Sequence, residues 1–260
     1  MGSENENANH FIPGFQAVRE ALLKSRENIE ELWIAEGKRS DRAKEILRLA
    51  GQRGVPVQFK KGTTLDDLLP DITHQGMVAL ARGYSYTDFN HIIDISQQGP
   101  GHALIIAADH ITDEGNLGAL IRTAAFFGAH GLILPKNRSA RVTGRVRKRS
   151  SGGYIHLPVA RVVNLGRALD TLNLKGFWII GATAGGPESI YGFDWMRDLI
   201  LVLGSEDRGL SRTVRTRCHE LVNIPACGHL DSLNISVASG IILSEIVRQR
   251  GLMMNKEKWK

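Results

Sequence analysis

Apolar residues in the second half of the chain form short runs of strand length, separated by stretches with helical spacing. The runs occupy residues 104–108, 131–134, 176–182, 199–203 and 220–224. The helical stretches occupy residues 117–127, 163–172, 211–217, with Ser211 as a predicted N-cap, and 233–250. Because strands and helices alternate, this half is predicted to form a parallel sheet with helices on both faces.

A shorter pattern of the same kind runs through the first 82 residues. Helices are predicted at residues 16–23 and 42–49, and strands at 32–35, 55–59 and 77–80. Glycine and proline fall where the connections between these elements are needed. The first part of the chain is therefore predicted to be a small α/β domain.

The composition changes between the two halves and marks a domain boundary. The change ends in Gly-Pro-Gly at residues 99–101, a sequence that resists both helix and central strand. We therefore predict a disordered tail at residues 1–10, a first domain at 11–83, a linker at 84–100 and a second domain at 101–260.

Three polar loops follow predicted strands and precede predicted helices. The loops carry Asn116 and Arg122, then Gly204 and Glu206, and then residues 232–238. In open parallel sheets a ligand lies beyond the carboxyl ends of the strands, and helix N-termini offer free backbone N–H groups there. The three loops are therefore predicted to form one site.

The overall composition is that of an ordinary globular protein. The chain has 260 residues, 42% of them hydrophobic and 23% charged. Its longest apolar runs are far shorter than the ~18 residues that a membrane helix needs, and no signal-like segment precedes them. The two cysteines, Cys218 and Cys227, have no metal-site or disulfide-framework spacing. We expect a cytoplasmic protein that does not contact a membrane.

Positive charge is concentrated in one short segment that contains no acidic residue. Its members are Lys136, Arg138, Arg141, Arg145, Arg147, Lys148 and Arg149. Like charges at this density repel each other, and a polyanion relieves the repulsion while releasing counterions. We favour RNA contact over a merely solvated loop, with Arg141, Arg145, Arg147, Lys148 and Arg149 as the RNA-binding candidates.

Several common sites are absent from the sequence. It contains no G-x-G-x-x-G, no phosphate-binding G-x-x-x-x-G-K-[ST], no G-x-S-x-G and no metal-ligand cluster. The histidines, including His74, His110 and His156, are isolated, and we predict no chemistry for them. A cofactor pocket of another kind remains.

The residues of the three loops resemble a known family. Residues 113–124 (DEGNLGALIRTA), 203–211 (LGSEDRGLS) and 224–238, which include SLNISVA, are similar to the three motifs of the SpoU/TrmH branch of the SPOUT RNA methyltransferases. The first domain resembles the substrate-binding module of the ribosomal protein L30e-like type through residues 13–18 and 74–79. The resemblance extends from about residue 11 to 250.

This resemblance implies a fold, a cofactor and an assembly. The fold would be an α/β sheet whose C-terminal segment is threaded into a trefoil knot, an exception to the rule that chains are unknotted. S-adenosylmethionine would be held mainly by backbone groups at Gly204, Ile224 and Leu233, with Thr183 lining the same pocket.

A homodimer is also implied. The helix that would pack against the partner carries Val237, Ile241, Ile242, Ile246 and Val247 and is too apolar for a free surface. An Ile242→Asp change is expected to abolish methylation.

The catalytic residues implied by the family motifs are Arg122, Asn116, Glu206, Ser232 and Asn234. Amide side chains suit the orientation of a ribose. Because a guanidinium stays protonated in proteins, we favour stabilisation of the alkoxide and grip on a phosphate over base action by Arg122. Three simpler roles stay open: a helix cap for each Asn and for Ser232, a surface position for Arg122 and a loop position for Glu206.

The expected function is 2′-O-methylation of a guanosine in 23S ribosomal RNA. The alternatives are a tRNA substrate, a resistance methylation at another ribosomal nucleotide, and an RNA-binding homologue without catalysis. Two departures from the family pattern concern the substrate more than the reaction: Gln16 stands where many relatives carry His, and residues 153–156 lack the usual acidic residue.

Overall fold

The computed structural model describes residues 9–23, 29–38, 40–70, 72–99, 101–205, 208–230 and 232–251. The chain divides into two compact units, residues 1–85 and 86–260. The predicted tail lies outside the described residues up to residue 8, whereas Asn9 and His10 belong to a strand. No helix in the described ranges is both long and apolar enough to cross a membrane.

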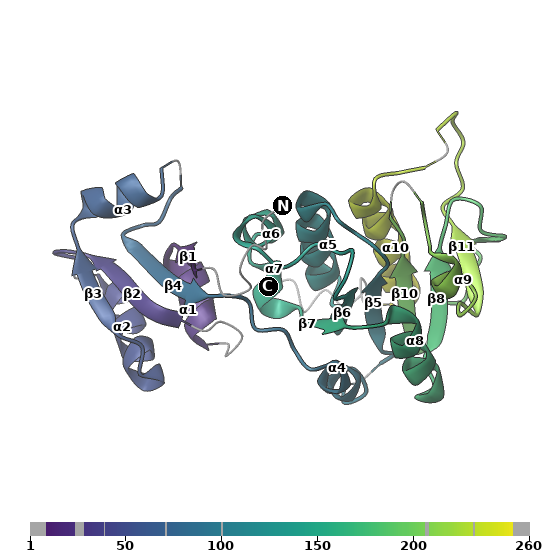
Figure 1. Ribbon diagram of the computed structural model, residues 1–260, viewed down its shortest axis with the longest axis horizontal. Coiled ribbons are helices and arrows are strands. Elements are labelled where there is room, and N and C mark those ends of the chain that lie inside the picture. The colour runs from purple at the N-terminus through teal and green to yellow at the C-terminus, as the bar shows by residue number, and fades with distance from the viewer. Residues whose placement is uncertain are drawn as a thin grey trace. The chain divides into compact units, whose positions relative to one another are not determined.

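The first unit is the small α/β domain that the sequence predicts (Figure 1). Its sheet has the spatial order β1 (Asn9–Pro13), β4 (Met77–Arg82), β2 (Ile29–Ala35) and β3 (Val57–Lys60). Strand β4 is antiparallel to β1 and β2, and β2 is parallel to β3. The helices are α1 (Phe15–Leu23), α2 (Asp41–Arg53) and α3 (Gly62–Leu68). Strand β1 and helix α3 were not predicted.

The core of the first unit lies between the sheet and helices α1 and α2. Leu32, Ile34 and Ile46 are fully buried there. Helix α2 begins at Ser40, whose side chain accepts the Ala43 N–H, and stops at Gly54, which takes the left-handed conformation with φ 64°. These local signals give the helix its bounds.

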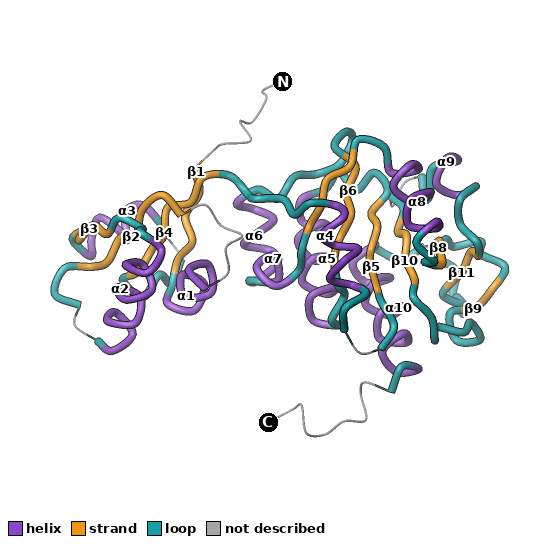
Figure 2. The backbone as a smooth tube through the Cα atoms, turned by 90° about the horizontal axis from the view of Figure 1, so that it is seen from below, coloured by secondary structure: helices purple, strands orange, loops and turns teal. Residues whose placement is uncertain are grey.

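The second unit contains a sheet of seven strands, all paired in parallel. The strands are, in spatial order, β7 (Val159–Val162), β6 (Gly131–Pro135), β5 (Leu104–Ala108), β10 (Leu199–Leu203), β8 (Trp178–Ala182), β11 (Glu220–Asn223) and β9 (Glu188–Ser189). Figure 2 shows β6, β5, β10, β8 and β11 side by side. All residues of β5, β6 and β10 are buried, as expected for a parallel sheet covered on both faces.

Helices cover both faces of this sheet (Figure 1). One face packs against α4 (Phe89–Ser96), α8 (Leu165–Leu174) and α9 (Arg212–Arg215), with Ile93, Leu169 and Val214 in the shared core. On the other face lie α5 (Glu114–Phe126) and α10 (Ile235–Gln249), which pack against each other, and α6 (Gly144–Ser150) and α7 (Gly153–His156), which pack on α5.

Helix α4 corrects the predicted domain boundary. It lies in the stretch 84–100 that was expected to be a linker, but Ile92 and Ile93 are buried in the core of the second unit. Its N-cap Asp88 accepts the backbone N–H groups of Asn90 and His91, so the helix is well defined at its start. The second unit therefore begins at Tyr86, before the Gly-Pro-Gly sequence.

The order of the strands places a crevice at the carboxyl ends of two central strands. After β5 the chain moves outward through β6 and β7, and it then returns to form β8 and β10 on the other side of β5. Such a reversal opens a space beyond the carboxyl ends of the two neighbouring strands, here β5 and β10. The predicted polar loops follow these strand ends.

Candidate functional site

A cavity of about 770 Å³ lies at the carboxyl ends of β8, β10 and β11. The four residues predicted to bind a cofactor all line it: Thr183, Gly204, Ile224 and Leu233. Its size is that of a pocket for a small organic molecule. Two of the three predicted loops, those that carry Gly204 and residues 232–238, therefore share this cavity with the loop after β8, whereas Asn116 and Arg122 are not among the described residues that line it.

Gly204 shapes one wall of this cavity. The loop after β10 folds back on itself, because Ser205 and Gly209 exchange backbone hydrogen bonds of 3.1 and 2.8 Å. A Cβ atom at Gly204 would lie 2.2 Å from the carbonyl carbon of Gly209. Only glycine permits this approach, which leaves backbone rather than side chains at the cavity wall.

The opposite wall is formed by the segment between β11 and α10 and by the first turns of α10. Ile224, Leu230 and Leu233 present apolar side chains, and Ser232 and Cys227 add small polar groups. Ser232 was predicted to be catalytic, and the structure places it on the cavity wall. The wall suits a ligand with an extended apolar or aromatic part and polar groups that meet backbone atoms.

Asn116 and Asn234 meet beside this cavity, although they come from different helices. The side-chain amide of Asn234 donates to Oδ1 of Asn116 over 3.0 Å. Asn234 is also the N-cap of α10 and accepts the Ser236 N–H, whereas the cap of α5 is Asp113. The capping role considered for Asn234 is therefore correct, and the structure adds its contact with Asn116.

Arg122 lies on another face of α5. It comes six residues after Asn116, a rotation of about 120° around a helix. Its side chain is exposed, donates to the Ser151 hydroxyl over 3.4 Å and is not among the described residues that line the cavity. Within a single chain, Arg122 therefore lies apart from the other catalytic candidates that the structure describes. Glu206 lies outside the described residues.

Two protein-family models match this chain, one for each unit. The model of the SpoU rRNA Methylase family matches residues 103–244, and the model for RNA 2′-O ribose methyltransferase substrate binding matches residues 11–87. The chain belongs to the SpoU rRNA methylase family. Its three predicted motif segments all lie in the matched range of the methylase model.

Relatives within the SpoU family match both units. The putative TrmH family tRNA/rRNA methyltransferase YacO of Bacillus subtilis is 35% identical over 92% of this chain and 96% of its own length. Among solved structures, the SpoU methyltransferase AviRb of Streptomyces viridochromogenes, in complex with the cofactor AdoMet, is 27% identical. It covers 93% of this chain and 90% of its own, with a TM-score of 0.77.

A smaller relative matches much less of the chain. The TrmH/SpoU tRNA modifying enzyme of A. aeolicus is 25% identical and covers 64% of this chain and 84% of its own, with a TM-score of 0.54. The second unit alone makes up about two-thirds of the chain. The part of this chain that the A. aeolicus enzyme covers is therefore close to the size of the second unit.

The basic segment of this SpoU protein forms helix α6 and its flanks. Arg141, Arg145, Lys148 and Arg149 are exposed, as expected of RNA-binding candidates. Arg147 differs from the prediction because it is only 6% exposed. It donates to the Val142 carbonyl and lies over the Tyr154 ring, so its charge stabilises the packing of α6 and α7 instead of facing solvent.

Tyr86 anchors the start of this basic segment. Its hydroxyl accepts the Val142 N–H over 3.0 Å, and the Arg161 guanidinium lies 5.3 Å from the centre of its ring. Burial raises the pKa of Tyr86, and the Val142 hydrogen bond opposes that shift, so the phenol stays neutral. The anchor therefore does not change with pH in the physiological range.

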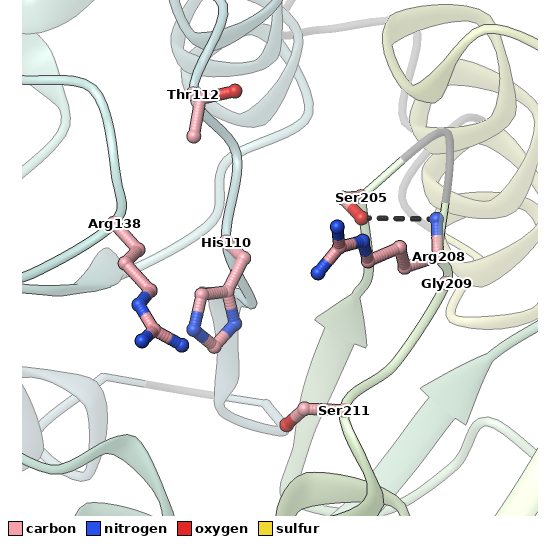
Figure 3. Close-up of a pocket in the computed structure, with 7 residues that line it drawn as sticks. All are labelled: His110, Thr112, Arg138, Ser205, Arg208, Gly209 and Ser211. Carbon is pink, nitrogen blue, oxygen red and sulfur yellow. Dashed lines mark hydrogen bonds between the residues drawn. The ribbon is translucent and has the colours of Figure 1, made fainter.

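The sequence did not reveal a second pocket, of about 450 Å³, next to the first (Figure 3). His110, Arg138 and Arg208 line it, together with Ser205 and Ser211. Ser205, Arg208 and Ser211 belong to the motif at residues 203–211, but His110 and Arg138 belong to none of the three motifs. The available signal was their position, since His110 and Arg138 closely follow β5 and β6.

Proposed function

We propose that this protein transfers a methyl group from S-adenosylmethionine to a ribose 2′-oxygen of RNA, and that its substrate is a guanosine of 23S ribosomal RNA. The observation that carries the proposal is the cavity at the carboxyl ends of β8, β10 and β11, which gathers all four predicted cofactor residues. The match of residues 11–87 to a 2′-O ribose substrate-binding model supports the ribose as the target. Because these RNAs lie in the cytoplasm, we propose the same location for the protein.

The cavity fits the cofactor on structural grounds. Its volume of about 770 Å³ is in the range of pockets for small organic ligands. Gly204 keeps one wall free of side chains, and Leu233 and Ile224 give apolar surface for an adenine ring. When bound, S-adenosylmethionine supplies the electrophilic methyl group. The strand order, with β10 inserted between β5 and β8, supports the proposal of a knotted path for the last segment.

The side chains around the cavity have separate proposed roles. The Asn116–Asn234 amide pair orients the ribose so that its 2′-oxygen lies in line with the methyl group. Ser232 on the cavity wall supports the same alignment. Arg122 stabilises the negative charge that develops on the 2′-oxygen as the hydroxyl proton passes to water, which requires no loss of its own proton. The other product is S-adenosylhomocysteine.

A homodimer completes this proposed site. In its own chain Arg122 contacts Ser151 and is not among the described residues that line the cavity. We therefore propose that each cavity works with the Arg122 of a second copy. Val237, which is 50% exposed on the first turn of α10, supports an apolar contact at that place.

The reaction and its substrate can be tested together. We expect that 23S ribosomal RNA from cells lacking the protein lacks one 2′-O-methylguanosine, and that the purified protein restores it. Mapping of 2′-O-methyl groups in ribosomal RNA and tRNA, with and without the protein, measures this. A change in tRNA alone would replace the proposed substrate by tRNA. Unchanged methylation in both pools would refute the proposed function.

Arg122→Ala tests the catalytic assignment. Loss of a charge that stabilises the transition state is expected to lower turnover by about 10²- to 10³-fold. Affinity for S-adenosylhomocysteine, measured by calorimetry, should stay within about twofold because the proposed partner of Arg122 is the ribose 2′-oxygen and not the cofactor. Turnover close to that of the unchanged protein would contradict the assignment.

A further inference from the structure

The second pocket lies at the reversal of the strand order. His110 follows β5, Arg138 follows β6 and Ser205 follows β10, so three neighbouring parallel strands deliver residues to one place. Ser205, Arg208 and Gly209 line both this pocket and the larger cavity. A ligand in the second pocket would therefore lie directly beside a ligand in the first.

Positive side chains converge in this pocket. Figure 3 shows the Arg138 and Arg208 guanidinium groups on opposite sides of the His110 ring and directed toward it. None of the ion pairs found between described residues involves either guanidinium. The hydroxyl groups of Thr112 and Ser211 also line the pocket. Two guanidinium groups with hydroxyl donors form a site for an oxyanion.

A buried carboxylate holds the pocket in shape. Asp109 is buried, and its Oδ2 accepts the Ser211 N–H over 2.7 Å. Its Oδ1 lies 2.6 Å from Nδ1 of His110. This contact fixes the orientation of the imidazole ring in the pocket. One buried group thus fixes both the imidazole and the start of α9.

The backbone of two lining residues is also unusual. His110 and Arg138 have φ angles of 61° and 53°, in the left-handed region that non-glycine residues rarely adopt. Such conformations persist where the surroundings impose them and are frequent at binding sites. Here both residues turn their side chains into the same pocket (Figure 3).

We propose that the pocket formed by His110, Arg138 and Arg208 binds a backbone phosphate of the substrate RNA, next to the nucleotide whose ribose is methylated. This inference rests on the proposed function and adds the contact that positions the substrate. A phosphodiester and a ribose hydroxyl of one nucleotide are close neighbours. A grip on the phosphate therefore restricts the position of the 2′-oxygen over the cofactor cavity.

Charge-removing variants test this pocket. The variants are Arg138→Gln, Arg208→Gln and their combination. The probes are 23S ribosomal RNA and total tRNA from cells lacking the protein. Each arginine variant is expected to weaken binding of the substrate RNA by about 3- to 10-fold and to lower the slope of log affinity against log salt by about 0.7 to 0.9. The double variant should show both effects more strongly.

Three controls make the result specific. Arg138→Lys keeps a charge and should recover part of the affinity. Lys175→Gln removes an exposed charge at the C-terminal end of α8, just before the amino end of β8, and should leave RNA binding unchanged. Affinity for S-adenosylhomocysteine should stay within about twofold in the Arg138 variants, because Arg138 lines only the second pocket, whereas Arg208 also lines the larger cavity.

Two outcomes would overturn the inference. RNA affinity and salt slope equal to those of the unchanged protein in the double variant would show that no phosphate is bound there. Loss of cofactor affinity with intact RNA binding would show that the pocket holds the charged end of the cofactor. Either result leaves methylation by the unchanged protein intact, whereas a failure of the proposed function removes that methylation itself.

Discussion

Asn116 and Asn234 illustrate what single residues do in this protein. They are 118 positions apart, yet the amide of one donates to the carbonyl of the other. Their identity was predicted from motifs, but the contact depends on how α5 and α10 begin. Asn116 and Arg122 differ in this respect from that pair. They are only six positions apart in the sequence, but their side chains leave α5 about 120° apart around the helix axis.

The reactivity of Cys227 and Cys218 tests the position of the larger cavity. Cys227 is exposed and lines the cavity that is proposed to hold the cofactor, whereas burial and the charge of Asp109 raise the pKa of Cys218 to about 11. The thiolate is the reactive form, and at pH 8 only about one part in a thousand of Cys218 is thiolate. We expect iodoacetamide to alkylate Cys227 first, and S-adenosylhomocysteine to slow that reaction.

Mass spectrometry of the labelled peptides measures both rates. Cys227→Ser should leave the protein almost unlabelled at pH 8, which serves as the control. Equal alkylation of Cys227 with and without S-adenosylhomocysteine would contradict its place in the cofactor cavity.

Buried strands were predicted more accurately than the helices whose position depends on tertiary contacts. Strands β5 and β10 have their predicted bounds because continuous apolar runs identify buried strands. Helix α6 was not predicted, since its residues are mostly charged and its few buried side chains give no apolar period. Helix α4 was placed in a linker. It is a short amphipathic helix, and its sequence does not show which unit its apolar face packs against.

Gly118 allows α6 to pack on α5. A Cβ atom there would lie 2.6 Å from the Arg149 Cβ and 2.9 Å from the Val146 carbonyl oxygen. Gly118→Ala should therefore force α6 outward and destabilise the unit by roughly 1–3 kcal/mol, partly offset by the helix propensity of alanine. A decrease of a few degrees in the melting temperature, measured by calorimetry, is the expected result.

Gly240→Ala is the matched control for this change. Gly240 also lies in a helix of the same unit, but the nearest atom to its Cβ position is Thr123 Cγ2 at 3.9 Å, an ordinary contact. This variant should be as stable as the unchanged protein or slightly more so. Equal melting temperatures for the two variants would argue against close packing at Gly118.

The whole molecule combines two units with separate proposed tasks, and assembly into a dimer is the step proposed to complete the site. Helix α10 was predicted to be an interface because of its apolar residues. The structure changes that argument: Ile242 and Ile246 are buried in the core of their own chain, and Val237 is the exposed member. Ile242→Asp would disrupt that core, so it does not test dimerisation.

Val237→Asp tests the dimer with little effect on the folded chain, since its side chain is 50% exposed. We expect a monomer in sedimentation experiments, with turnover lowered by about 10²-fold because Arg122 no longer reaches a second cavity. Val163→Asp is the control, since Val163 is 74% exposed and lies outside α10. A monomeric Val237→Asp protein with full activity would refute the shared site.

The alternation of strands and helices, the division into two units and the family motifs were all accessible from the sequence. These depend on local periodicity and on residue identity, which are written along the chain. Four findings needed the folded structure: Asn116 meets Asn234, Arg147 is buried, α4 belongs to the second unit, and His110, Arg138 and Arg208 share a pocket. The order of strands in the sheet sets all of these contacts, and that order depends on packing between distant segments rather than on local pattern.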